Sequence, residues 1–467
     1  MSIQISSSTI PNPEELGLTT ASARRDAYLV GLLNQCQALD LQVIEPQIAA
    51  LLQELRDRAS VWVKELTIPT KRDEEWRFTD LSPLLQIQFQ KPEINVDFAS
   101  EITEFILPEA PIRLVFINGA YAPKLSSVAQ LPEGLIVSNL AQLPVTHRSK
   151  VGQYLATKEG VTEVFTALNT AGLTDAAVVW VAKNTVVETP IHLLFLTVAG
   201  EDKIITQPRF LVVSESGSSV SLTEEYINLP SEEKAVYFSN AVTEIFLEQN
   251  AEVNHTRIQR EGTAAFHIGK TAISQARDSR YTCNAISVGA KLSRHNLEVV
   301  QTGEQIETTL NGLTVIAEEQ LADTHSVMAY TKPYGTSNQL HKCIVSDKAS
   351  AVFNGKVFVP QAAQLTNANQ LNRNLLLSPK ARVDTKPQLE ITADNVKCSH
   401  GATVGQLEAD EIFYLQSRGL NEADARNLLI DAFAAEIINK IAIASLRKQL
   451  SQSVRKITAT PRLAEKQ

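Results

Sequence analysis

The sequence predicts a mainly β protein. A parallel β-helix core over residues 106–405 is expected between an N-terminal helical domain, 1–105, and a C-terminal helical domain, 406–467. Helix formers with amphipathic spacing occupy both ends of the chain. Roughly 280 residues between them lack helical periodicity, are rich in Val, Ile and Thr, and break at turn residues about every ten positions. A weak internal repeat through this stretch favours stacked coils over a closed barrel.

The N-terminal domain is expected to be helical because residues 47–63 consist largely of good helix formers. Pro69 should end this segment, and a cluster of charged and aromatic residues follows at 71–81. The i, i+3, i+4 spacing predicts one buried stripe, formed by Ile48, Leu51, Leu52, Leu55 and Ala59.

The repeat in the middle region consists of a turn or small residue, two polar or small residues, and a branched apolar residue. Each recurrence is expected to mark one turn of a coil, whose inward apolar residues are buried only by stacking on the next coil. Four asparagines between two of these marks are expected to stack at a corner: Asn367, Asn369, Asn372 and Asn374. The repeat occurs at 217–220, 250–253, 303–306, 350–352, 362–365, 380–383 and 393–396.

The C-terminal domain is expected to contain two helices joined as an αα-hairpin. Residues 408–418 carry acids in the first turn and a base in the last, with Gly419 as the terminating residue. Asn421 should cap the second helix. The apolar stripe of that helix is Ile430, Phe433, Ile437 and Ile441.

Composition restricts the class of protein. The 467 residues carry a net charge of −9, which provides no bulk attraction to nucleic acid or to anionic membranes. The four scattered cysteines form no CxxC pair, and no secretory signal or membrane-length apolar run is recognisable. We therefore expect a soluble cytoplasmic protein from a reducing compartment.

Two enzyme classes receive little support from motifs. Residues 262–271 resemble a phosphate-binding loop but place six residues between the glycines instead of four, so we expect no nucleotide to bind to this chain itself. The acid pairs Glu224–Glu225 and Glu318–Glu319 are expected to be exposed to solvent. A carbohydrate-active site assembled from distant coils remains an alternative.

Cys398 and His400 are the best candidate metal ligands. At positions i and i+2 of a strand they project from the same face, and thiolate and imidazole suit iron or iron–sulfur species. Two ligands do not complete a tetrahedral site, so further groups must come from elsewhere or from a partner. Cys283 and Cys343 are expected to be small core residues, although His341 repeats the spacing beside Cys343.

Several motifs closely resemble those of the SufB/SufD family of iron–sulfur cluster assembly proteins. The Glu-Trp-Arg segment and Cys-Ser-His-Gly favour the SufD branch, since SufB usually carries a Cys-Glu-His variant. The matching segments are Pro69-Thr-Lys-Arg-Asp-Glu-Glu-Trp-Arg-Phe-Thr79, Phe116-Ile-Asn-Gly-Ala-Tyr121, Ala167-Leu-Asn169, Thr189-Pro-Ile191, Lys397-Cys-Ser-His-Gly-Ala-Thr-Val-Gly405 and 412–426.

The resemblance implies a right-handed parallel β-helix and a non-catalytic scaffold subunit in a complex of one SufB, one SufD and two SufC ATPase chains. It implies pairing with SufB through the β-helix and a transient iron–sulfur cluster at that interface, with roles for His400 and Cys398. It also implies SufC docking through 408–441. Within that segment we expect the contacts to be Phe413, Tyr414, Arg418 and Phe433.

Some questions stay open at this stage. The isolated chain could form a homodimer or act as a SufB-like primary scaffold, and flavin binding is undecided. For residues 71–80, we expect Trp76 and Phe78 to anchor the helical domain on the β-helix with the charges in solvent. Recognition of a sulfur donor or another partner is the alternative for this motif.

Overall fold

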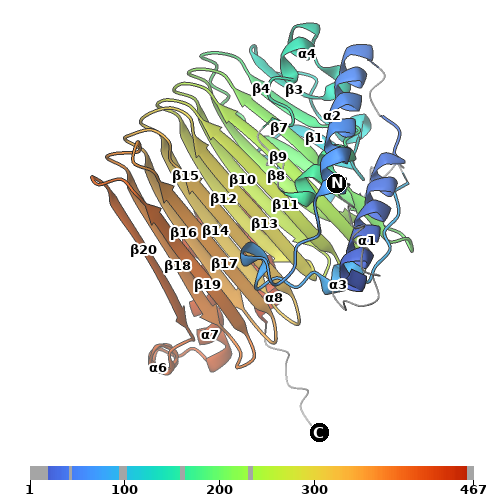
Figure 1. The fold of residues 1–467 in the computed structure, drawn as a ribbon. Coiled ribbons are helices and arrows are strands. Elements are labelled where there is room, and N and C mark those ends of the chain that lie inside the picture. The colour runs from blue at the N-terminus through green and yellow to red at the C-terminus, as the bar shows by residue number, and fades with distance from the viewer. Residues whose placement is uncertain (1–18, 42–44, 94–101, 158–162, 230–234, 460–467) are drawn as a thin grey trace, which may run out of the picture.

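The chain forms a long parallel β-solenoid flanked by helices at both ends of the sequence, which confirms the predicted fold class (Figure 1). The structure is a computed structural model that describes residues 19–41, 45–93, 102–157, 163–229 and 235–459. Within these residues the strands form two ten-stranded sheets, and the chain alternates between them.

The first sheet runs from β2 to β20. Apart from the antiparallel β1–β2 pair, its neighbours are parallel and in continuous register, as in the pairing of Cys398 with Ala368. In spatial order its strands are β2 (Ala120–Tyr121), β1 (Ile112–Ile117), β5 (Ile191–Val198), β8 (Ser219–Leu229), β10 (Glu252–Glu261), β12 (Arg280–Gly289), β14 (Glu307–Ile316), β16 (Thr336–Val345), β18 (Asn367–Leu376) and β20 (Lys397–Gly405).

The second sheet supplies the opposite wall of the solenoid. It begins with an antiparallel β3–β4 pair and continues in parallel. Its strands are β3 (Leu135–Asn139), β4 (Ala177–Val181), β7 (Arg209–Ser214), β9 (Tyr237–Leu247) with β6 (Ile204–Thr206) beside it, β11 (Phe266–Gln275), β13 (Leu292–Gln301), β15 (Leu321–Ala329), β17 (Ser350–Val359) and β19 (Arg382–Ile391).

Tight turns join the sheets and explain the repeat seen in the sequence. Gly217 and Asn250 each have a positive φ, +73° and +57°, just before β8 and β10. Gly and Asn tolerate this left-handed conformation better than other residues do. The recurring turn residue therefore marks the point at which the chain reverses into a new strand.

The interior of the solenoid is filled by alternate residues of both sheets. Apolar side chains from successive coils form one continuous core, which includes Val253, Tyr281 and Cys283 from the first sheet and Ile273 and Val299 from the second. A second part of the interior is polar and contains buried ionisable side chains. The solenoid therefore encloses an apolar column beside a polar one.

The N-terminal helices cover the outer face of the second sheet. They are α1 (Thr19–Gln37), α2 (Pro46–Glu65) and the short α3 (Ser82–Leu85). On α2, Ile48, Leu52, Leu55 and Ala59 are buried as predicted, whereas Leu51 is half-buried. Residues 94–101, at the end of the predicted N-terminal domain, lie outside the described residues.

Two short helices interrupt the middle region, in which the sequence shows no helical periodicity. Helices α4 (Val145–Val151) and α5 (Val164–Ala171) lie within it, and every residue of α5 is buried. At seven and eight residues they span about two turns each, too short to show a clear 3.6-residue periodicity.

The C-terminal hairpin was predicted correctly, with one addition. Helix α6 (Ala409–Ser417) ends before Gly419, whose φ is +97°, and the Asn421 side chain accepts a hydrogen bond from Asp424 N to cap α7 (Glu422–Ile438). A third helix, α8 (Ala444–Thr458), follows. Helices α7 and α8 pack through Ile437 and Leu446 on the outer face of the first sheet.

The asparagines expected at a corner instead lie along strand β18. Asn372 and Asn374 are buried in the interior, and Asn374 Nδ2 donates to Asn372 Oδ1 at 2.6 Å. Asn367 and Asn369 point outward and are exposed. Because side chains alternate along a strand, this row is divided between interior and solvent and does not form a corner stack. Among the described residues, no helix is long and apolar enough to cross a membrane.

Candidate functional site

The last coil of the solenoid carries the two ligands predicted from the sequence. Strand β20 ends the first sheet and pairs only with β18 among the described strands, so one of its edges is unpaired. It lies at the outer limit of the sheet, away from the N-terminal helices (Figure 1). Most of its residues are exposed, in contrast to the buried alternation of β18.

His400 lies at the open end of a column of polar interior side chains. In register, it is paired with Gln370 on β18, which is paired with Gln339 on β16. Gln370 Nε2 donates to Gln339 Oε1 at 2.8 Å, and Gln339 Nε2 donates to Ser326 Oγ at 2.8 Å. His400 itself is exposed. It therefore occupies the next position of a hydrogen-bonded row and faces the end of the solenoid.

Gln370 leaves one polar atom available beside His400. Its Oε1 atom is buried and has no hydrogen-bond partner among the described residues. A buried carbonyl oxygen without a partner is costly, so it is a favourable acceptor for a donor placed at the end of the column. Neither Gln370 nor Gln339 was singled out from the sequence, because their alignment with His400 depends on residues about thirty positions apart.

Cys398 occupies a different environment on the same strand. It is half-buried and packs against the apolar interior core. Burial raises the pKa of the Cys398 thiol, and a backbone hydrogen bond at Ala368 offsets only part of this effect. The thiol is therefore held mainly as the neutral form, and it would have to lose its proton to bind a metal.

Together these residues provide two ligands and not a complete site. Thiolate and imidazole are suited to iron and iron–sulfur species. In the described part of the chain no group of three or more His, Cys, Asp or Glu residues is placed to hold a metal ion. By themselves, Cys398 and His400 therefore do not make up a complete metal site within the described residues.

The remaining cysteines have the environment expected of core residues. Cys283 and Cys343 are fully buried, which confirms their predicted role. His341, two residues before Cys343, stacks on Phe353 with ring centroids 5.0 Å apart and lies far inside the solenoid. Burial lowers the pKa of His341 to about 4, so this histidine is a neutral interior residue.

The expected exposure of Glu224 and Glu225 was wrong. Both carboxylates are completely buried, where Glu224 pairs with His255 Nε2 at 2.7 Å and Glu225 pairs with His192 Nε2 at 3.1 Å. Their partners come from neighbouring coils, a relationship that the local sequence does not reveal. Burial also removes them as acids that could reach a carbohydrate.

The expected exposure of the second acid pair is confirmed, and the segment that resembles a phosphate-binding loop is a strand. Glu318 and Glu319 are exposed at a turn. Gly269 and Lys270 lie within strand β11, and Lys270 Nζ pairs with Glu298 at 3.0 Å. A phosphate-binding loop requires a free lysine at the start of a helix, which this segment does not provide.

Three of the four residues expected to contact SufC are exposed on the C-terminal hairpin. Helix α6 has no buried residue, and Phe413 and Tyr414 are 71% and 57% exposed. Arg418 is also exposed and stacks over the Tyr414 ring at 5.3 Å. Phe433 differs, because it is half-buried against its own chain with Lys342 Nζ 4.0 Å from its ring.

The segment around Trp76 attaches to the outer face of the second sheet. Trp76 is buried, and Arg294 from β13 stacks over its ring at 3.8 Å. Not all charges in this segment are in solvent: Glu75 bonds His325 Nδ1 at 3.1 Å, and this bond lowers the pKa of Glu75. Phe78 is only half-buried. Trp76 therefore has the predicted anchoring position, supported by ion pairs that were not anticipated.

Comparison with known proteins agrees with this architecture. Residues 195–433 match the family described as SUF system FeS cluster assembly, SufBD core domain, and residues 32–193 match the SufBD protein N-terminal region. An iron–sulfur cluster assembly SufBD family protein of Synechocystis is 52% identical over 412 residues, which are 87% of this chain and 91% of that protein.

Two further relatives extend the comparison. The chloroplastic protein ABCI7 of Arabidopsis thaliana is 34% identical, over 88% of this chain and 87% of its own length. The iron–sulfur cluster assembly protein SufD of Escherichia coli is 33% identical, over 82% of this chain and 88% of its own length. These similarities span the helices, the solenoid and the candidate ligands, and the chain therefore belongs to the SufB/SufD family of iron–sulfur cluster assembly proteins.

Proposed function

We propose that this chain is a SufD-type scaffold subunit that shares a transient iron–sulfur cluster with a SufB partner at the open end of its solenoid. The observation that carries the proposal is the unpaired edge of β20, which presents Cys398 and the exposed His400. Two ligands at an uncovered edge provide half of a cluster site, and a second chain can supply the rest.

The same edge is suited to pairing with another solenoid. An unpaired strand exposes a row of backbone N–H and C=O groups that can extend a sheet across an interface. Pairing at β20 would place partner residues directly beside Cys398 and His400. It would also cover the half-buried side chains of β19. We propose that SufB forms this contact, and that a homodimer uses the same surface when SufB is absent.

Docking of the SufC ATPase is proposed for the exposed face of α6. Phe413 and Tyr414 are large apolar side chains in solvent, as is typical of residues that anchor a protein interface. Arg418 lies on the same surface. Phe433 is not proposed as a direct contact with SufC, because it packs against Lys342 of its own solenoid.

The packing of α7 suggests how an ATPase could influence the cluster site. Lys342 on β16 donates to Phe433 O at 2.8 Å and pairs with Glu436 on α7 at 2.5 Å. Strand β16 pairs with β18, and β18 pairs with β20. Movement of the hairpin by a dimerising ATPase would therefore be transmitted through two strand pairings to the proposed interface.

The chain is proposed to act without its own catalysis, in a reducing cytoplasmic compartment. Its four cysteines are all free thiols, as expected where disulfides do not persist. Nucleotide hydrolysis is assigned to the SufC partner. The cluster is a cargo assembled between chains and is not a resident cofactor of this chain.

Co-expression with SufB and SufC tests the proposal. His400→Ala should leave the mass of the purified complex unchanged and reduce its iron and acid-labile sulfide. Thr403→Ala is the matched control, because Thr403 lies on the opposite face of the same strand. Full cluster content in His400→Ala, with an intact complex, would contradict the proposed role of His400. Cluster retention by the chain purified without SufB would instead identify a SufB-like primary scaffold.

A further inference from the structure

A cavity of about 580 Å³ opens between helix α1 and the segment that precedes Trp76. Its wall includes Arg25 from α1 and residues 67–73 and 80–82. A volume of this size is typical of sites for small organic ligands. The cavity does not include any residue of the proposed cluster site.

Six charged side chains line this cavity, three of each sign, but they are not distributed evenly. Lys71 pairs with Asp80 at 3.8 Å, and Asp80 also accepts a hydrogen bond from Ser82 N at 2.9 Å. Asp73 accepts a hydrogen bond from Thr70 N at 2.6 Å. Two of the three carboxylates are therefore already bonded within their own segment.

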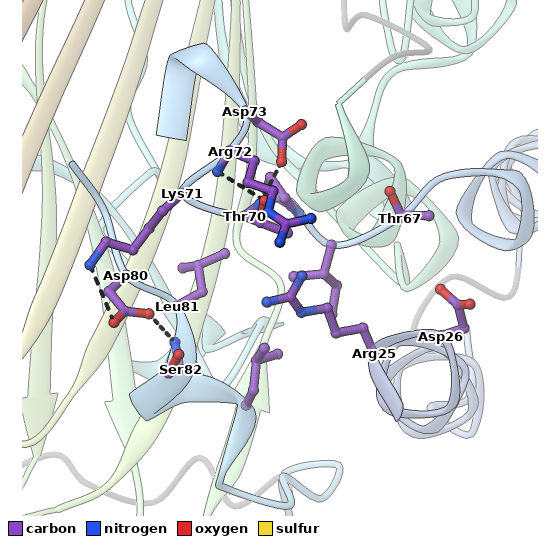
Figure 2. Close-up of a pocket in the computed structure, with 13 residues that line it drawn as sticks. Arg25, Asp26, Thr67, Thr70, Lys71, Arg72, Asp73, Asp80, Leu81 and Ser82 are labelled. Carbon is purple, nitrogen blue, oxygen red and sulfur yellow. Dashed lines mark hydrogen bonds and ion pairs between the residues drawn. The ribbon is translucent and has the colours of Figure 1, made fainter. Parts of the chain in front are cut away.

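Unlike these two carboxylates, the guanidinium groups of Arg25 and Arg72 are not bonded within the described part of their own segments. Figure 2 shows both side chains reaching into the cavity toward each other, one from α1 and one from the opposite segment, while Asp26 points away from the space between them. Neither guanidinium has a hydrogen bond or ion pair with another described residue. Hydrogen bonds with Ser82 lower the pKa of Asp80, and the charges of Lys71 and Arg25 add to this effect, so Arg25 has only a shared anionic neighbour in the cavity. An anionic ligand between the two guanidinium groups would give both of them a direct partner.

Guanidinium groups have a geometry that suits one class of anion. Their planar N–H donors match the two oxygens of a carboxylate or phosphate. The hydroxyl of Thr67 lines the same space and can add a further donor. The cationic part of the cavity is therefore equipped to bind an oxyanion.

Four apolar residues also line the cavity. Ile68 and Leu81 are buried, and Pro69 and Leu85 are half-buried. A bare inorganic ion would leave these surfaces in contact with water. A ligand with an oxyanion at one end and a small apolar body at the other would satisfy both parts of the lining.

We propose that this cavity binds a small organic oxyanion, a carboxylate or phosphate monoester, between Arg25 and Arg72. This inference does not depend on the cluster-scaffold function. It assigns a ligand-binding role to the start of the Lys71–Asp80 motif, separate from the anchoring role of Trp76. A cavity of this volume with buried apolar residues in its lining favours a small molecule over an acidic protein surface.

Calorimetric titration of the full chain with phenyl phosphate, phenylacetate and inorganic phosphate tests this site. Phenyl phosphate or phenylacetate should bind saturably, and their relative affinities distinguish a phosphate site from a carboxylate site. Inorganic phosphate should bind more weakly than phenyl phosphate, because it lacks the apolar body. Arg25→Gln and Arg72→Gln should each weaken binding by about tenfold or more.

Arg277→Gln is the matched control, because it removes an arginine that pairs with Asp278 at the surface outside the cavity. Its affinity should equal that of the unaltered chain. Melting temperatures without ligand establish that each variant is folded. Ligand should raise the melting temperature of the unaltered chain and of Arg277→Gln, but not that of the Arg25 and Arg72 variants. Absence of saturable binding by both organic probes up to about 10 mM would overturn the proposal. The proposal would also be overturned if the Arg25→Gln/Arg72→Gln double variant bound the probes as tightly as the unaltered chain does. A further titration with a polyglutamate peptide tests for an acidic protein partner, and binding of this peptide alone would contradict a small-molecule site.

Discussion

Gly355 on β17 leaves the space that Gln370 on β18 occupies inside the solenoid. A Cβ atom added at Gly355 would lie 2.7 Å from Gln370 Cδ, well inside van der Waals contact. The two strands belong to opposite sheets, so the glycine accommodates a side chain that crosses the interior. The absence of a side chain at position 355 thus supports the polar row that ends at His400.

Gly355→Ala is therefore expected to displace Gln370 and destabilise the fold by about 1–3 kcal/mol, the usual cost of overpacking a filled interior. Urea unfolding followed by circular dichroism measures this change. Gly405→Ala is the control, because a Cβ there would meet no atom within 4 Å. Equal stability of the two variants would show that Gln370 moves aside without cost. If the row also positions His400, Gly355→Ala should lower cluster content in the co-expressed complex.

Trp76→Ala should destabilise the attachment of the N-terminal helices. The substitution removes a buried ring that packs on Phe165 with centroids 5.6 Å apart and carries Arg294 on its face. The expected loss is about 3–5 kcal/mol, as for other large aromatic residues replaced by alanine. Limited proteolysis and thermal unfolding measure it, with the less buried Phe78→Ala as the comparison. A larger effect for Phe78→Ala would contradict the assignment of Trp76 as the main anchor.

The solenoid was predictable because its turns leave a local signal. Asn250 and Asp278 both adopt positive φ where one coil passes to the next, and such residues recur often enough to be seen in the sequence. The end helices were equally visible from their stripes and from the cap at Asn421. The short helix α5 was not visible, because its eight residues span about two turns, too few to show a clear 3.6-residue periodicity.

The candidate ligands could be predicted for a similar local reason. Cys398 and His400 are two residues apart, so strand geometry alone places them on one face. The residues that support them could not be predicted, because Gln370 is placed beside His400 only by the register between coils. Glu224 was misjudged for the same reason: its partner His255 lies on the next strand of the sheet. Burial of charge in this fold depends on contacts between coils.

The His255–Glu224 pair should make stability depend on pH. Burial disfavours both charged forms, but hydrogen bonds with Cys283 and Glu224 raise the pKa of His255 to about 9. Burial raises the pKa of Glu224, but this effect is outweighed by the hydrogen bond and charge of His255, the charge of Arg257 and the hydrogen bond of Thr243. The net result is a pKa lowered to about 2. A raised histidine pKa stabilises the fold fully below about 6.5, and this contribution is lost as the pH rises through about 9. The glutamate contribution is present above about 4.5 and is lost as the pH falls toward 2.

His255→Gln should therefore reduce the free energy of unfolding more at pH 6 than at pH 9.5. Urea titrations of both proteins across this range measure the difference. His147→Gln is the control, since the pKa of His147 is lowered, chiefly by burial, and its protonation does not stabilise the fold. A constant difference across the range would show that His255 is not charged in the folded protein.

The exposed aromatic residues of α6 predict a separable docking defect. Phe413→Ser combined with Tyr414→Ser should leave the melting temperature unchanged, because α6 buries none of its own residues. Capture of SufC should weaken by at least about tenfold, as expected when central aromatic contacts of an interface are lost. Leu428→Ser is the control, because Leu428 is also an exposed apolar residue of the hairpin, at 49% exposure, but lies on α7. Normal SufC capture by the α6 variant would show that SufC does not dock on Phe413 and Tyr414.

The thiols should differ sharply in reactivity, which provides a direct test of the exposed solenoid end. Cys36, Cys283 and Cys343 are buried, whereas Cys398 is half-buried on the open edge. Alkylation of the native isolated chain should therefore modify Cys398 first, as measured by peptide mass spectrometry. Because burial raises the pKa of Cys398, the reaction should be slow at pH 7 and accelerate as the pH increases. Cys398→Ser should abolish the early label, and binding of SufB should protect the unaltered thiol. Rapid labelling that persists in the assembled complex would place Cys398 outside the interface, and the shared-cluster proposal would lose one of its two ligands.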